Sequence, residues 1–440
     1  MAPQFTTRLG FHRVGLPEQE LDLRPEPTTQ AEIPTPIPKH FRCFPPRAMT
    51  YPQGKRALVF GASGITGWAV VNEILHDYPA KGVFDKVVAL TNRPLSLEVS
   101  QWPADKRLEI VSGIDILKGT QEHLEATIKS KIPDIDTITH VYYYAFKPQP
   151  DVQAELKDAV DMLTRTTIAL DRLAPKLEFI NLQTGTKQYG YYLRQDHYFP
   201  VPLKENLPRL KKPFADDIFY YPQVDFLTEF SKGKKWTWNE TRPDMIIGFV
   251  CNLSNHSLAE IMGVYLSLWV KVYGRDSEVP FPGNPGSWVA KHNEAGADMI
   301  ARQNIFTSLH PSTCGHGEAF NTGSNPQWHN WEQKWPQIAA YFGLKGTPPV
   351  SETPKHRPRD FIDEHFDEWL ALEKEHGLRP GVAKSEVRQP VFELGQLEWT
   401  DFDRQVDMTK LQQVGFTESA EVMEIWGTCF DRMRKAKQIP

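Results

Sequence analysis

A glycine-rich turn constrains this chain more than any other feature of its sequence. Gly61, Gly64 and Gly67 form the pattern GxxGxxG directly after the apolar run 57–60, and residues 68–78 then carry apolar side chains at helical spacing. A strand, a tight glycine turn and a helix in this order typically hold the phosphates of a dinucleotide, because the helix N-terminus presents free backbone N–H groups to them. The residues that we expect to form this site are Gly61, Ser63, Gly64, Ile65, Thr66 and Gly67.

Short apolar runs alternate with amphipathic stretches along the chain after residue 55. The runs that we expect to be strands are 57–60, 86–92, 108–114, 139–146, 177–185, 244–250 and 318–324. The longest stretch between them, 151–173, repeats its apolar residues with a helical period. Strands that alternate with helices predict an α/β fold, in the form of a Rossmann-type doubly wound parallel sheet.

The chain divides into three parts by composition. Residues 1–54 contain ten of the 36 prolines and show no sustained apolar period, which predicts a proline-rich N-terminal extension. Residues 55–250 hold the glycine turn and most of the expected strands, so we expect the nucleotide-binding Rossmann domain there. Residues 251–440 are mainly helical, with one Rossmann strand near 318–324, and predict a substrate-binding cap over the carboxyl edge of the sheet.

Composition excludes several other classes of protein. With 50 Lys and Arg against 55 Asp and Glu, the net charge of −5 offers no electrostatic basis for binding nucleic acid. The four cysteines lie far apart and form no CxxC pair, which argues against a disulfide scaffold and a zinc site and favours a reducing compartment. The longest apolar-looking run, 261–274, is too short to span a bilayer. We therefore expect a cytoplasmic protein without a metal, a membrane span or a nucleic-acid partner.

The end of the second expected strand indicates which dinucleotide binds. A free ribose 2′-hydroxyl usually meets an acidic residue there, but this chain has Thr91, Asn92 and Arg93. Because a guanidinium can form charge-assisted hydrogen bonds with a 2′-phosphate, we predict NADPH rather than NADH; the alternative makes Arg93 a solvated surface charge. The further residues expected at the cofactor are Asp115, Ile116 and Tyr144.

Short-chain dehydrogenases usually carry a Tyr and a Lys four residues apart on one helix. Two such strings occur here, at 51–55 and 341–345, but neither lies where that helix is expected. The segments LQTGTKQYG (182–190) and LPRLKKPFADDIFYYPQVDF (207–226) instead resemble the atypical short-chain dehydrogenases of the progesterone 5β-reductase and iridoid synthase family. Further segments match in the expected order, so that the resemblance covers about residues 55–440.

The resemblance implies a catalytic pair. In that family the lysine lies in a TGxKxY motif after the fifth strand and the tyrosine is the first of the two in an FYY motif, which correspond to Lys187 and Tyr220 here. A tyrosine hydroxyl can stabilise the oxyanion that develops when a carbonyl compound accepts hydride. A nearby ammonium lowers the pKa of that tyrosine and can hold the nicotinamide ribose. Without the resemblance, Tyr220 would be interpreted as a core aromatic residue and Lys187 as a surface charge.

Aromatic residues predict the lining of a substrate pocket. Several lie in the loop 189–202 between the two motifs, and others lie after the fourth strand or in the cap. The residues that we expect to line the pocket are Phe146, Tyr191, Tyr192, Trp269 and Trp288. An apolar site with few polar groups suits a hydrophobic enone or polycyclic carbonyl compound.

The sequence thus predicts an NADPH-dependent reductase of specialised metabolism that reduces the activated C=C of an enone or enal by 1,4-addition of hydride. One alternative is a carbonyl (1,2-) reductase on the same scaffold. Another is a non-reducing NADP-binding regulator or a cyclase, although a pure sensor would not need the Lys187 and Tyr220 pair. The oligomeric state stays open, a homodimer included.

Overall fold

The computed structural model describes residues 51–193, 199–252, 257–384 and 395–440. By its internal contacts the chain separates into two units, Met1–Thr50 and Tyr51–Pro440, and the second contains every element described below. An N-terminal extension that ends at residue 54 and a cap that begins at residue 251 stay predictions.

A seven-stranded sheet forms the core of the second unit, and all its strands are parallel. The strand order is β10-β6-β5-β4-β1-β2-β3. The strands have the bounds β1 Lys55–Phe60, β2 Phe84–Thr91, β3 Leu108–Ser112, β4 His140–Tyr143, β5 Phe179–Gln183, β6 Thr237–Pro243 and β10 Glu318–Thr322. The chain winds outward from β1 in both directions, which places a topological switch point between β1 and β4.

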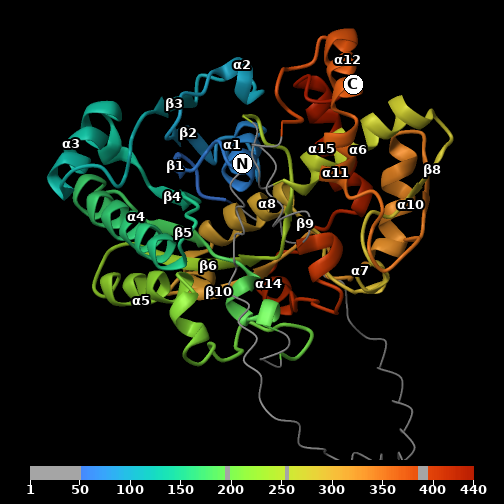
Figure 1. The fold of residues 1–440 in the computed structure, drawn as a ribbon. Coiled ribbons are helices and arrows are strands. Elements are labelled where there is room, and N and C mark those ends of the chain that lie inside the picture. Colours follow the sequence, from blue (N-terminus) through green and yellow to red (C-terminus); the bar gives the residue numbers. More distant parts are fainter. Residues whose placement is uncertain (1–50, 194–198, 253–256, 385–394) are drawn as a thin grey trace, which may run out of the picture. The chain divides into compact units, whose positions relative to one another are not determined.

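Helices cover both faces of this sheet (Figure 1). Helices α1 and α8 pack together on one face, while α3, α4 and α5 cover the other. The larger helices have the bounds α1 Ile65–Leu75, α3 Gln121–Lys131, α4 Val152–Leu173, α5 Tyr220–Phe230, α6 Leu258–Tyr273, α8 Ala297–Ser308, α10 Trp331–Tyr341, α12 Phe366–His376 and α15 Val422–Lys435. The shorter ones are α2 Leu97–Ser100, α7 Pro285–Val289, α9 Pro311–Cys314, α11 Pro358–Glu364 and α14 Thr409–Gln413.

The side chains of β1 show how the two cores are divided. Ala57 and Val59 belong to the core beneath α1 and α8, whereas Leu58 and Phe60 belong to the core beneath α3 and α4. A strand that buries both faces must be apolar throughout, which explains the uninterrupted run at 57–60. The parallel sheet with helices on both faces confirms the predicted Rossmann-type α/β fold.

The sixth strand does not lie where the sequence predicts it. The apolar run 244–250 contains only the two-residue strand β7 (Ile246–Ile247), which pairs with β9 (Ala295–Gly296) outside the main sheet. The sheet instead uses β6, whose Asn239, Glu240 and Thr241 are buried. These side chains find polar partners on neighbouring elements, so a strand that looks too polar can lie inside the protein. The prediction for 244–250 was therefore wrong.

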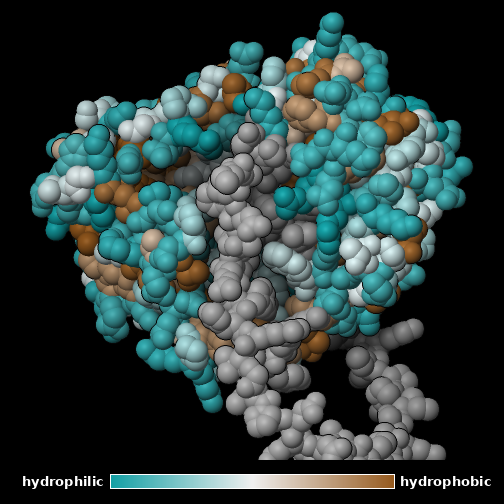
Figure 2. Space-filling view, viewed as in Figure 1, coloured by the Kyte–Doolittle hydropathy of each residue, from teal (hydrophilic) through white to brown (hydrophobic). Residues whose placement is uncertain are grey.

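The region after residue 250 is mainly helical, apart from β10 and short strands. There α6 contacts α11, α12 and α15, to the right of the sheet in Figure 1. A small parallel pair joins β8 (Glu278–Pro280) to β11 (Lys345–Thr347). None of the helices in the described ranges is long and apolar enough to cross a membrane. The face in Figure 2 is predominantly hydrophilic wherever grey atoms do not cover it.

Candidate active site

The glycine turn lies between β1 and α1, as predicted, and backbone packing explains its glycines. Gly61 has a φ of +73°, and a Cβ on it would lie 2.6 Å from the carbonyl oxygen of Tyr144. A Cβ on Gly67 would lie 2.3 Å from the carbonyl oxygen of Gly61. Side chains at these two positions would collide with backbone atoms, so the turn can close only with glycine.

The N-terminus of α1 fits the phosphates of a dinucleotide. Gly64 is its N-cap residue and has no side chain that could cap the helix, so the N–H groups of the first turn are left for a ligand. Ser63 and Ile65 are partly exposed beside it. Thr66 is buried, and its hydroxyl accepts a hydrogen bond of 3.1 Å from Nε2 of Gln183 at the end of β5. These residues would hold the pyrophosphate.

The ends of β2 and β3 supply the other expected cofactor residues. Asn92 and Arg93 are exposed directly after β2, where a guanidinium can reach a 2′-phosphate in solvent. Asp115 is exposed after β3, and its Oδ1 accepts a hydrogen bond from the Leu117 N–H at 3.0 Å. The Ile116 side chain packs into the core beneath α3 and α4.

Tyr144 follows β4 and lies against the glycine turn through its carbonyl group. Its hydroxyl donates to Asn181 Oδ1 and accepts from Asn304 Nδ2, both at 2.9 Å. Burial raises the pKa of this hydroxyl well above its ordinary value. Its side chain therefore links β4 to β5 and α8.

The structure brings the Lys187 and Tyr220 segments together. Lys187 lies in the 3₁₀ turn η2 (Thr186–Tyr189), directly after β5, and Tyr220 is the first residue of α5. A Cβ on Gly185 would lie 3.3 Å from the Tyr220 hydroxyl oxygen, so that hydroxyl reaches the start of the turn. The neighbouring Tyr221 donates a hydrogen bond of 2.7 Å to the carbonyl of Gln188 and ties α5 to the same turn.

The charge of Lys187 has a mixed environment. Burial lowers the pKa of its ammonium group from the ordinary value, while the carboxylates of Glu155 and Asp217 act in the opposite direction. Glu155 lies in the first turn of α4 and Asp217 shortly before α5. The two acidic groups therefore favour the protonated lysine that the proposed chemistry needs.

A buried polar network that the sequence did not predict supports the Lys187 turn from the neighbouring strand β6. Glu240 in β6 is only 2% exposed. Its carboxylate accepts hydrogen bonds from the Thr184 hydroxyl at 2.6 Å and from Gln188 Nε2 at 3.0 Å, and it pairs with Arg242 at 2.7 Å. Arg242 also donates to the Tyr189 hydroxyl at 3.0 Å. Only the unusual acidic residue inside WTWNETRP could have signalled this network from sequence.

Aromatic side chains surround Tyr220. Phe219 meets the Tyr220 ring at 4.5 Å between centroids, and Phe146 stacks on Phe219 at 5.6 Å with 19° between the planes. Phe146 is 44% exposed, so this aromatic series runs from the surface to the candidate catalytic tyrosine. Phe219 was not among the predicted residues.

A second aromatic group lies directly after the segment LQTGTKQYG (182–190), which carries Lys187. Tyr191 is partly exposed, and its ring centroid lies 6.3 Å from that of Phe402, a C-terminal residue that the sequence did not single out. Tyr192 is in the turn η3 (Tyr191–Leu193), but its side chain lies outside the described residues.

The two cap tryptophans belong to the core of the helical region. Trp269 in α6 is buried against Tyr265 and Phe361. Trp288 in α7 packs on Phe281 at 5.2 Å. None of the ring contacts described for either tryptophan reaches the Lys187 turn or Tyr220. Their role in substrate binding stays a prediction.

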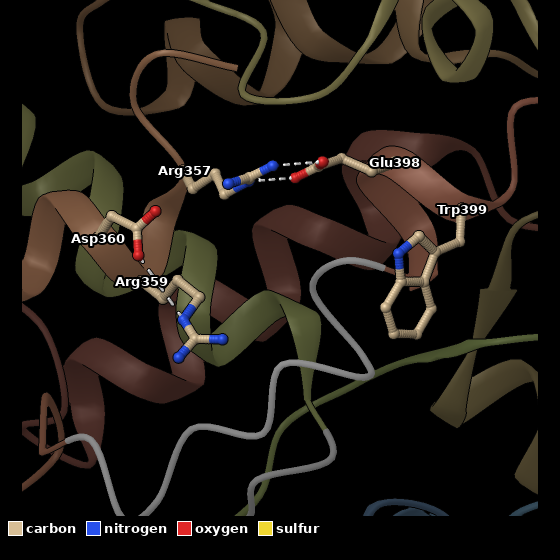
Figure 3. Close-up of a pocket in the computed structure, with 5 residues that line it drawn as sticks. All are labelled: Arg357, Arg359, Asp360, Glu398 and Trp399. Atoms are coloured by element: carbon tan, nitrogen blue, oxygen red, sulfur yellow. Dashed lines mark hydrogen bonds and ion pairs between the residues drawn. The ribbon is translucent and has the colours of Figure 1, made fainter. Parts of the chain in front are cut away.

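A cavity of about 200 Å³ opens elsewhere, between the start of α11 and the segment Gly395–Trp399. Its lining residues are Arg357, Arg359, Asp360, Glu398 and Trp399 (Figure 3). Arg357 faces Glu398 through two hydrogen bonds of 2.6 and 2.9 Å, and Arg359 lies 3.8 Å from Asp360. The lining charges thus balance in pairs.

Within the described ranges, no cluster of His, Cys, Asp and Glu side chains could hold a metal ion.

The sheet with the glycine turn at its switch point is a nucleotide-binding Rossmann arrangement, and the family match and relatives below make the chain an NAD(P)-dependent oxidoreductase of the short-chain dehydrogenase type. Residues 57–440 match the family described as PRISE-like Rossmann-fold domain. The chain belongs to this family, which confirms the resemblance to progesterone 5β-reductase and iridoid synthase.

Individual relatives agree with this membership. The short chain dehydrogenase sirQ of Leptosphaeria maculans is 37% identical over 390 residues, which cover 87% of this chain and 97% of sirQ. The 3-oxo-Delta(4,5)-steroid 5-beta-reductase of Arabidopsis thaliana is 31% identical over 66% of this chain and 69% of its own length. Among solved structures, UDP-N-acetylglucosamine 4-epimerase from Methanobrevibacter ruminantium has a TM-score of 0.57 and 13% identity, covering 87% of this chain and 99% of that chain. This last likeness concerns the fold alone.

Proposed function

We propose that this protein is an NADPH-dependent reductase that adds hydride to the activated C=C of a hydrophobic enone or enal, with Tyr220 and Lys187 as its catalytic residues. The observation that carries the proposal is the meeting of two segments at the carboxyl edge of the sheet. The Tyr220 hydroxyl lies beside Gly185, and Lys187 follows two residues later in the turn after β5. The glycine turn leaves the same edge of the sheet after β1.

The residues of the chain have distinct roles in this proposal. When bound, NADPH supplies the hydride. Tyr220 donates its hydroxyl hydrogen bond to the carbonyl oxygen of the substrate, where negative charge develops as the β-carbon accepts hydride. Lys187 keeps a positive charge next to the tyrosine and holds the nicotinamide ribose through its ammonium donors. Burial lowers the pKa of Lys187, and the carboxylates of Glu155 and Asp217 oppose that effect and favour the protonated form.

The preference for NADPH rests on the end of β2. Arg93 is exposed there, its neighbours in the sequence are Asn92 and Pro94 and not an acidic residue, and a guanidinium binds a 2′-phosphate through charge-assisted hydrogen bonds. An acidic side chain in this place would instead repel the phosphate and accept from a free 2′-hydroxyl.

The proposed substrate class rests on the aromatic surroundings of Tyr220. Phe146, Phe219, Tyr191 and Phe402 offer ring faces near the two motifs, which suits a flat, conjugated and largely apolar molecule. The name of the Arabidopsis relative, 3-oxo-Delta(4,5)-steroid 5-beta-reductase, supports a conjugated ketone as substrate. We propose a role in specialised metabolism.

Product identification with 4-deuterated NADPH tests the proposed function. The full chain is incubated with a panel of cyclic and acyclic enones and enals, and the products are assigned by mass spectrometry and NMR. We expect saturated carbonyl compounds that carry deuterium on the β-carbon. Allylic alcohols with deuterium on the carbonyl carbon would replace the proposal with the 1,2-reductase. Cyclised products without NADPH oxidation, or no product at all, would favour the cyclase or the regulator.

A further inference from the structure

A short C-terminal segment is linked to the proposed catalytic turn through one buried carboxylate, Asp244. Residues 403–407 follow the π-helical turn Gly395–Trp399 and precede α14, far along the chain from Lys187. Two parts of the chain hold the segment. On one side, the N–H of Arg404 donates to the carbonyl of Lys291 at 2.9 Å, and the N–H of Val406 donates to Asn293 Oδ1 at 2.9 Å. The segment is therefore a fixed part of the fold.

On its other side, the segment pairs with the end of the loop that follows the turn. The N–H of Leu203 donates to the carbonyl of Gln405 at 2.7 Å, and the N–H of Asp407 donates to the carbonyl of Leu203 at 2.8 Å. Leu203 itself is fully buried. The loop between the Lys187 turn and Leu203 thus ends on the C-terminal segment.

Arg404 connects this segment to the turn through a chain of buried polar groups. Arg404 and Asp244 are 2% and 7% exposed, and Nε of Arg404 donates to Oδ2 of Asp244 at 2.9 Å. The other carboxylate oxygen, Oδ1, accepts a hydrogen bond of 3.0 Å from the hydroxyl of Thr186, which is also buried. Thr186 immediately precedes Lys187 in η2, so one carboxylate fixes the catalytic turn and the C-terminal segment together.

The same chain reaches the aromatic side of the site. Burial raises the pKa of the Tyr191 hydroxyl; Asp244 raises it further, while Arg404 and a hydrogen bond with Thr186 lower it. These influences show that Tyr191 lies within electrostatic range of both members of the ion pair. Phe402, two residues before Arg404, packs beside Tyr191 and Phe199.

We propose that Arg404 is a positioning residue for the Lys187 turn: it holds Asp244 against the Thr186 hydroxyl, so that the C-terminal segment 403–407 completes the active site. This inference rests on the proposed function for the role of Lys187, but the geometric link between segment and turn does not depend on which reaction is catalysed. A buried carboxylate that bridges two segments can hold both only while each of its partners is present.

Two substitutions test the link from opposite ends. Thr186→Val keeps the shape of the side chain and the Arg404–Asp244 ion pair but removes the hydroxyl. Arg404→Lys keeps the charge but loses the geometry of the guanidinium. The matched control is Arg107→Lys, because Arg107 is also paired with aspartates, Asp105 and Asp77. It lies just before β3, the outermost strand on the side of the sheet away from β5 and its turn.

The readouts separate positioning from general stability. For Thr186→Val and Arg404→Lys we expect kcat to fall about tenfold while the KM for NADPH changes less than about twofold, since a small displacement of a catalytic group affects turnover more than cofactor binding. Hydrogen–deuterium exchange should become faster in peptides that cover residues 184–191. The Arg107→Lys control should leave both quantities as in the native protein, whatever its melting temperature.

The exchange measurement also decides the matter if the proposed function fails. Should the native chain reduce no enone, faster exchange at 184–191 in the two variants alone would still support the link between segment and turn. Native-like exchange there in both variants would overturn the proposal, as would equal loss of kcat in the control.

Discussion

Two turns leave the carboxyl edge of the same sheet, and they are built in opposite ways. The glycine turn after β1 is shaped by backbone atoms: Gly61 lies so close to the carbonyl of Tyr144, and Gly67 to that of Gly61, that no side chain fits at either position. The turn after β5 is shaped by side chains, with Thr184, Thr186 and Gln188 bonded to distant residues. The first turn thus depends on close backbone packing, and the second depends on side chains from distant parts of the chain.

The two turns also differ in the task that we propose for them: the first would bind the cofactor, and the second would position a catalytic group. A backbone turn can hold phosphates with its N–H groups wherever the local sequence permits it. The proposed catalytic lysine would have to be held at a defined distance from its tyrosine, and the groups that support its turn come from β6, α5 and the C-terminal segment. Substitutions in the two turns should therefore affect different quantities: stability and cofactor affinity in the first turn, and kcat in the second.

The largest expected effect is on kcat, for a substitution of the tyrosine that lies beside the turn after β5. Tyr220→Phe should lower kcat by about 10²- to 10⁴-fold, the usual loss when a positioned acid is removed, while NADPH affinity stays unchanged. Steady-state kinetics and titration of NADPH fluorescence measure the two quantities. An unchanged kcat would show that another group stabilises the oxyanion.

Tyr221→Phe is the matched control for this variant. Its hydroxyl donates to the Gln188 carbonyl and accepts from the Leu210 N–H, so its removal should cost about 1–3 kcal/mol of unfolding free energy. The loss of kcat should be much smaller than in Tyr220→Phe.

Two glycine substitutions test the backbone-built turn. Gly67→Ala should lower the free energy of unfolding by about 1–3 kcal/mol, because its Cβ would collide with a backbone oxygen. Gly64→Ala has an ordinary φ of −81° and a Cβ contact of 3.2 Å, so the fold should survive. That variant should instead weaken cofactor binding by about tenfold or more, or about 1.4 kcal/mol. Chemical denaturation and cofactor titration separate the two outcomes, and equal loss of stability in both variants would contradict this account.

Arg93→Asp should change the choice of cofactor without touching either turn. Loss of a charge-assisted hydrogen bond to the 2′-phosphate is worth about 1.5–3 kcal/mol, so kcat/KM for NADPH should fall by about 10- to 100-fold while that for NADH is kept or rises. Lys176→Asp makes the same charge change before β5, on an exposed residue at the other edge of the sheet, and serves as the control. If the two variants behave alike, the 2′-phosphate is held elsewhere.

The smallest expected effect is on the pH dependence of turnover. Burial lowers the pKa of Lys187 from its ordinary value of 10.5. The ammonium form of Lys187 supports Tyr220, so kcat should have its maximal value below that lowered pKa. It should fall as the pH rises through the pKa, and the fall should therefore begin below pH 10.5. Lys187→Arg keeps the charge to higher pH and should move the fall upward. A pH profile of the native enzyme that is flat to pH 10.5 would contradict this role.

The sequence predicted the fold and the position of the glycine turn well because both depend on local patterns. Alternating apolar runs identified most strands of the sheet, and the family motifs singled out Lys187 and Tyr220, whose catalytic role stays a prediction. The sixth strand was missed because Asn239, Glu240 and Thr241 are polar and buried at once. Such a strand is stable only through partners that lie elsewhere in the chain.

The side-chain contacts that support the turn after β5 could not be predicted in the same way. Arg404 lies 160 positions from Asp244, and Asp244 lies 58 positions from Thr186. No local period or spacing relates these residues, since their meeting depends on how β6 and the C-terminal segment pack.

What the sequence alone determined is therefore the glycine turn and the parallel sheet that carries it, because backbone conformation and apolar periodicity are properties of neighbouring residues. What only the tertiary structure decided is which charged and aromatic groups surround Lys187 and Tyr220. A buried carboxylate such as Asp244 or Glu240 is tolerable only when folding brings its donors within hydrogen-bond distance, and those donors come from remote parts of the chain.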